Sequence, residues 1–134
     1  MNRKNARENA FILLFELSCK SDETAIEIFD KATTVRELEC DEYVKKVYFG
    51  VNENLRIIDE CIDSSIVGWK SNRLSVVSKA ILRLAIYELM FIEDIPAKVS
   101  INEAIEISKK YDDDKAYMLV NGALNSAAEK LGRK

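Results

Sequence analysis

The stretch that decides the fold is "VVSKAILRLAIYELMFI", residues 76–92. It is apolar on nearly every side of a helix, as expected for a helix buried at the centre of a bundle. Ser75 precedes it and is suited to cap its first turn, and Pro96 ends the helical run. The sequence therefore predicts a central helix with deeply buried side chains, among them Ile81, Leu84 and Leu89.

Helical periodicity continues upstream of this stretch. An amphipathic helix is expected over residues 4–19, and Ser21 is suited to cap a second helix. A long row of apolar residues with helical spacing follows Asp41, and Gly50 and Asn52 are expected to divide it into two helices. The upstream half of the chain is therefore helical throughout.

The downstream part of the chain carries signals for two more helices. Ser100 and Glu103 have the spacing of a capping box. The acidic run 112–114 is suited to begin a last helix, which ends at Leu131 with Gly132 after it. The whole pattern predicts an all-α fold of about seven helices.

The length and composition indicate a single soluble domain spanning residues 1–134. No apolar run is long enough for a membrane span and no signal peptide is apparent, so a cytoplasmic protein is expected. Three cysteines without a CxxC pair are expected to be reduced thiols. The absence of histidine makes a hydrolase or a metalloenzyme less favoured. The protein is expected not to be an enzyme and to bind no metal and no cofactor.

The net charge of -3 hides a segregation of charge along the chain. Residues 21–68 carry twelve acidic and five basic side chains, whereas residues 69–92 carry one acidic and four basic ones. The first twenty residues are also net basic. A local basic surface on an acidic protein can bind a nucleic acid without general stickiness.

Three cations, Arg3, Lys4 and Arg7, lie at the start of the first helix. Arg3 and Arg7 are four residues apart and project from one helical face. They could form a phosphate-binding patch. The alternative is a solvated first turn in which Lys4 pairs with Glu8.

A second polar row follows the central helix, at Ser75, Lys79, Arg83 and Tyr87. On so apolar a helix this spacing predicts one solvent-facing stripe that could extend the basic surface. In the alternative, Lys79 and Arg83 extend from the edge of the core to the acids of residues 37–42.

Tyr111 ends a predicted helix beside Lys109 and Lys110. An aromatic ring next to basic side chains suits base stacking combined with phosphate contact. A half-buried anchor at the helix end is the alternative. The acidic run that follows could suggest a metal site, but helix capping explains it more simply.

Four segments together resemble the NusB family of bacterial transcription antitermination factors: "RKNARENAFILLFEL", "NRLSVVSKAILRLAIYEL", "IPAKVSINEAIEISKKY" and "LVNGALNSAAEK". The resemblance implies seven helices in two packed helical subdomains. It also implies a role: NusB proteins pair with NusE, a small-subunit ribosomal protein, and bind the boxA element of ribosomal RNA transcripts. The pair then joins an RNA polymerase antitermination complex.

The resemblance also suggests which residues bind RNA, as Arg3, Lys4 and Arg7 match the family's N-terminal RNA contacts. Met118 and Leu119 stand where the family often has a basic residue and a Phe, and Phe15 where a Tyr is common. Lys115 is a candidate to supply a compensating charge. The full set expected to bind RNA is Arg3, Lys4, Arg7, Lys79, Arg83, Tyr111 and Lys115.

Two other functions are compatible with the sequence. One is a stand-alone relative of the NusB-like domain of ribosomal RNA methyltransferases, although a chain of 134 residues leaves no room for a methyl-donor site. The other is a helical protein-interaction module with weak or lost RNA binding, which the substitutions at 118 and 119 favour.

Overall fold

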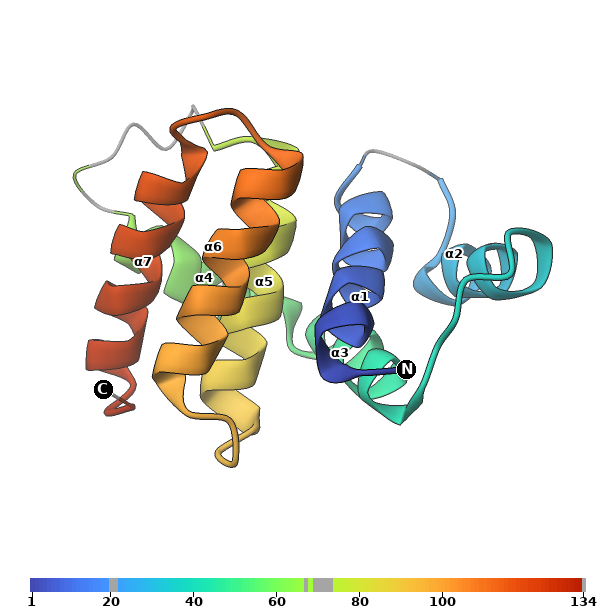
Figure 1. Ribbon diagram of the computed structural model, residues 1–134, viewed down its shortest axis with the longest axis horizontal. Coiled ribbons are helices and arrows are strands. Elements are labelled where there is room, and N and C mark those ends of the chain that lie inside the picture. Colours follow the sequence, from blue (N-terminus) through green and yellow to red (C-terminus); the bar gives the residue numbers. More distant parts are fainter. Residues whose placement is uncertain (20–21, 67, 69–73, 134) are drawn as a thin grey trace.

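The computed structural model describes residues 1–19, 22–66, 68 and 74–133. In these ranges the chain forms seven α-helices and one π-helical segment, η1, and no strand, which confirms the all-α prediction. The elements are α1 (Arg3–Ser18), α2 (Ala25–Asp30), η1 (Lys31–Val35), α3 (Glu42–Glu53), α4 (Leu55–Ser65), α5 (Val76–Phe91), α6 (Ala97–Tyr111) and α7 (Ala116–Lys130). Helices α1 to α3 lie on one side of the molecule and α4 to α7 on the other (Figure 1).

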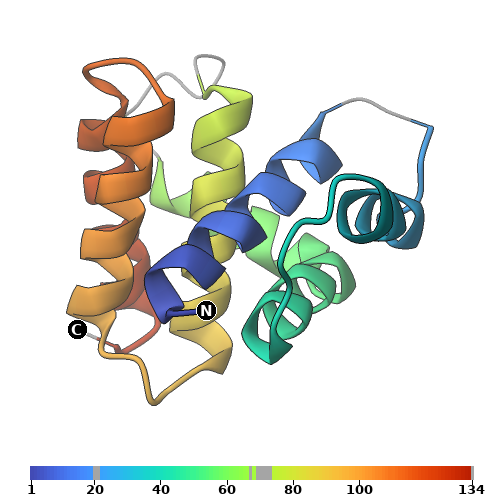
Figure 2. The same cartoon turned by 45° about the vertical axis from the view of Figure 1, so that its right-hand side comes forward.

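Helix α5 lies at the centre of the fold. It packs against α1, α3, α4, α6 and α7, and Figure 2 shows α1 crossing it. Every side chain from Ala80 to Leu89 is buried. The prediction of a central helix with deeply buried Ile81, Leu84 and Leu89 is therefore confirmed.

The predicted solvent-facing stripe on α5 is wrong. Arg83 and Tyr87 are each only 6% exposed, because α3 and α4 pack over this side of α5. Gly50, inside α3, makes the close approach possible, since a Cβ there would lie 2.5 Å from Cζ of Tyr87. The expected division of the apolar row is real, but it falls at Asn54, between α3 and α4.

Short polar side chains determine where several helices begin. The Ser75 hydroxyl oxygen accepts the N–H of Ser78 at 2.9 Å, as predicted for the cap of α5. Thr24 caps α2 and forms a capping box with Glu27, whereas the predicted cap, Ser21, lies outside the described residues. The capping box predicted at Ser100 is wrong, because α6 begins one turn earlier, directly after Pro96.

The last helix ends as its signals predict, but its start differs. Helix α7 begins at Ala116 after the N-cap residue Lys115, so the acids of 112–114 lie outside its first turn. The Asp113 carboxylate accepts the N–H groups of Lys115 and Ala116, each at 3.0 Å. Gly132 adopts φ +68°, and the N–H of Arg133 donates to the carbonyl of Ala128 at 2.8 Å. This is the hydrogen-bond pattern of a glycine-terminated helix. Across the residues that the structure describes, no helix has both the length and the apolar character needed to cross a bilayer.

Candidate nucleic-acid interface

The first turn of α1 presents two exposed cations that diverge. The Lys4 side chain is 67% exposed, and its Nζ lies 3.7 Å from a carboxylate oxygen of Glu103 on α6. Arg3 is exposed on the side of α3, where its guanidinium carbon lies 4.3 Å from the centroid of the Tyr43 ring. Both cations can therefore reach a ligand without breaking a buried contact.

Arg7 is not part of this exposed surface. It is 5% exposed, and its Nε donates to Oε2 of Glu88 at 2.8 Å. Position 7 follows the buried Ala6, on a helix that packs mainly against α5 and α3, and its Nη1 also lies 3.8 Å from a carboxylate oxygen of Glu103 on α6. The expectation of an exposed Arg3–Arg7 pair is therefore wrong.

The partner of Arg7 is a carboxylate without any exposed surface, that of Glu88 on α5. Oε1 of Glu88 accepts the Ser100 hydroxyl at 2.7 Å, and Oε2 also accepts the Tyr43 hydroxyl. Burial and the nearby Glu88 charge raise the pKa of Tyr43, so its hydroxyl stays a donor. The donors come from α1, α3 and α6, and together they satisfy a buried charge that would otherwise be costly.

Arg83 is also engaged inside the protein. Its Nε and Nη2 donate to the two carboxylate oxygens of Asp59 on α4, at 2.9 and 2.8 Å. Its Nη1 donates to the Ser18 hydroxyl at the end of α1, at 2.8 Å. The arginine thus joins α1, α4 and α5, and its partner is not among the acids of 37–42. Lys79, one turn earlier on α5, is half-buried.

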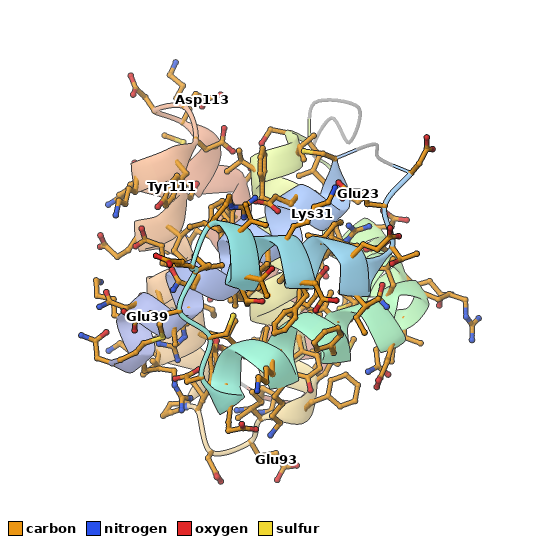
Figure 3. All side chains as sticks on the ribbon, turned by 90° about the vertical axis from the view of Figure 1, so that its right-hand side faces the viewer. Glu23, Lys31, Glu39, Glu93, Tyr111 and Asp113 are labelled. Atoms are coloured by element: carbon orange, nitrogen blue, oxygen red, sulfur yellow. The ribbon has the colours of Figure 1, made fainter. Side chains whose placement is uncertain are left out.

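Tyr111, at the end of α6, is packed as an anchor and is also partly exposed. Its hydroxyl hydrogen-bonds Glu8 of α1, and its ring packs against Phe11 with 5.0 Å between centroids. It is nevertheless 38% exposed, and Figure 3 shows it at the end of α6, away from Glu23 and Lys31. The anchor is present in the structure, and base stacking by the exposed part stays a prediction.

Lys110 adds an ion pair to this contact between α6 and α1. Its Nζ lies 2.7 Å from Oε1 of Glu8, and it remains 61% exposed. Hydrogen bonds from Lys110 and Tyr111 hold the pKa of Glu8 below its ordinary value, so the carboxylate is charged at neutral pH. The exposed cations Arg3, Lys4 and Lys110 are called the basic edge. Lys115 is also exposed, but it is the N-cap residue of α7 and stands apart from this group.

Comparison with known proteins places the chain in a family. The sequence model of the NusB family matches residues 4–129. The chain belongs to the NusB family. Transcription antitermination protein NusB of Clostridium perfringens is 40% identical over 98% of this chain and 99% of its own length. The NusB of Bacillus licheniformis is 42% identical over 98% and 99%.

Solved structures of the family share the fold. Thermotoga maritima NusB superposes with a TM-score of 0.83, at 36% identity over 97% of this chain and 92% of that chain. A structure of the antitermination factors NusB and NusE in complex with double-stranded RNA gives a TM-score of 0.82, at 27% identity over 96% of both chains.

Two of the three positions at which the sequence was expected to depart from the NusB pattern, Met118 and Leu119, lie in the first turn of α7. Met118 is 48% exposed, whereas Leu119 is half-buried and packs against the core. Helix α7 packs mainly against α4, α5 and α6, and Figure 1 shows α6 between α7 and α1. The first turn of α7 is therefore separated from α1 by α6.

Proposed function

We propose that this protein is a transcription antitermination factor that binds boxA-type RNA of ribosomal RNA transcripts together with a NusE-type ribosomal protein. The main support is its similarity, over 96% of both chains, to a NusB solved with NusE and double-stranded RNA. The pair would then join an RNA polymerase antitermination complex. This role requires binding surfaces only, and no catalytic group.

The geometry favours a revised set of RNA contacts. The basic edge and the exposed face of Tyr111 can meet phosphates and bases, and half-buried Lys79 remains a candidate at its margin. Arg7 and Arg83 are better assigned to anchoring the helices. Arg7 could reach a phosphate only by leaving the fully buried Glu88 carboxylate without its cation, which is strongly unfavourable. Arg83 is itself only 6% exposed and forms a two-bond pair with Asp59, which it would have to give up.

A second function is supported by Met118, which exposes an apolar side chain where the family often carries a cation. A protein-interaction module that has weak or lost RNA binding would tolerate this change. The proximity of Glu8 and Glu103 to the cations of the basic edge points the same way, because these carboxylates offset part of the positive charge.

Titration of boxA-type RNA at one fixed salt concentration separates the two functions. We expect the isolated protein to bind about tenfold more weakly than its complex with the NusE-type partner, a difference of about 1.4 kcal/mol. Equal affinity with and without the partner would contradict the partner dependence. Absence of binding in both forms would favour the protein-interaction module.

A further inference from the structure

A groove of roughly 460 Å³ opens beside Arg3, between α1, α3 and the loop that joins α5 to α6. The Tyr43 ring and two isoleucines form its apolar lining, and both acidic and basic side chains line it as well. Its residues include Arg3, Tyr43, Lys46, Ile92, Asp94 and Ile95.

We propose that this groove takes one unstacked base of single-stranded RNA, with the Arg3 guanidinium as the surface on which the base stacks. The inference rests on the proposed RNA-binding function and names a subsite within it. In this proposal Arg3 contacts a base, whereas the sequence predicted that it contacts a phosphate.

The placement of Arg3 suits this role. The guanidinium lies over the Tyr43 ring, 4.3 Å from its centroid, and Arg3 also lines the groove. Unpaired RNA bases stack on aromatic rings and on arginine guanidinium planes. A base entering the groove can therefore continue a stack that Tyr43 and Arg3 have already begun.

The ring beneath Arg3 is held firmly. Tyr43 is 6% exposed, and its hydroxyl donates to the buried carboxylate of Glu88. Glu88 is itself held by Arg7 and Ser100. A preorganised surface loses little conformational freedom when a ligand binds. The buried network therefore favours binding of a base to Arg3, although its own residues do not contact the RNA.

The charges of the groove favour a base over a phosphate. Arg3 and Lys46 are matched by Glu42 and Asp94, so the lining has no net charge. A phosphate would meet two carboxylates there, whereas a base offers apolar faces and a polar edge. Carboxylates accept hydrogen bonds from amino groups such as N4 of cytosine. We therefore assign the groove to a base that carries an exocyclic amino group.

The test uses Arg3→Lys in the full chain, because lysine keeps the charge and removes the planar group. RNA affinity should fall about tenfold, the value of one stacked base, while the salt dependence of binding stays as in the parent. The matched control is Arg56→Lys, at a side chain on α4 that is 85% exposed, and it should bind as the parent does.

A set of RNAs, each with one abasic nucleotide, locates the base. At one position the abasic RNA should bind parent and Arg3→Lys equally, because the stacking contact is then absent from both. A fluorescent base analogue at that position should change its emission more on binding the parent than on binding the variant, because only the parent moves the base from its neighbours onto Arg3.

Three results are decisive. If Arg3→Lys binds like the parent while Arg3→Ala binds weakly, Arg3 contacts a phosphate and the inference is wrong. If every abasic position weakens parent and variant equally, no base occupies the groove. If the parent binds no RNA, with or without the partner, the proposed function itself fails, and this outcome is distinct from the other two.

Discussion

Replacing Arg7 with alanine is expected to lower the free energy of unfolding by about 3–5 kcal/mol. The change removes the cation that neutralises Glu88, a carboxylate with no exposed surface. The remaining donors, Ser100 and Tyr43, are neutral and do not replace the lost charge. Urea unfolding at neutral pH, followed by helical circular dichroism, measures the effect.

Arg3→Ala is the matched control for this measurement, one turn earlier on the same helix. Arg3 is exposed and its guanidinium lies over the face of the Tyr43 ring, and such a contact is worth about 0.5–1 kcal/mol at an exposed site. Equal, small losses for Arg7→Ala and Arg3→Ala would show that Arg7 is not buried against Glu88.

Gly50→Ala is expected to destabilise the protein by about 1–3 kcal/mol, as overpacking of a core does. At an ordinary helix position the same change is stabilising by roughly 0.5–1 kcal/mol. Here the added Cβ would lie 2.5 Å from Cζ of Tyr87. That ring is only 6% exposed, so the clash is relieved only by moving a ring that is packed in the core or by separating α3 from α5.

A double-mutant comparison shows whether the ring causes the loss. In a Tyr87→Ala background, Gly50→Ala should be neutral or stabilising, because the obstructing ring is gone. Both effects can be read from the midpoint and slope of urea unfolding. A stabilising Gly50→Ala in the parent protein would mean that α3 and α5 are not in close contact at this point.

The sequence predicted the helices well because apolar periodicity and capping residues depend only on residues that are close together in the chain. The apolar character of 76–92 identified the central helix, and Ser75 and Gly132 marked two helix ends correctly. The boundary between α3 and α4 was placed at Gly50 and Asn52 instead of Asn54. A glycine suggests a break, but here it serves a close contact with a residue 37 positions away, which no local pattern reveals.

The candidate site was harder to predict because the spacing of charged residues along a helix does not show whether they face water or a buried partner. Arg3 and Arg7 have the spacing of one helical face, yet only Arg3 is exposed. Arg83 has the spacing of a solvent-facing stripe, yet it is paired with Asp59. One signal was available: Glu88 is the only acid in the apolar stretch 76–92, and a lone buried acid requires a partner.

The departures at Met118 and Leu119 also take on a different meaning in the structure. Met118 is exposed, but Leu119 packs against the core, so enlarging it to Phe would alter packing as well as add a ring. A gain in RNA binding from changing these two residues is therefore not expected to depend on Arg3.

The most direct test is whether the positive charge of the exposed first-turn cations contributes to RNA binding. The affinity of boxA-type RNA for the complex with the NusE-type partner can be measured over a range of salt concentrations, for the parent and for Arg3→Ala combined with Lys4→Ala. Each lost phosphate contact on single-stranded RNA lowers the log–log slope by about 0.7. Arg56→Ala, which removes a similar exposed cation on α4, should leave the slope unchanged. A shallower slope and weaker binding in the double variant are the predicted result, whereas a parent-like slope and affinity would contradict it.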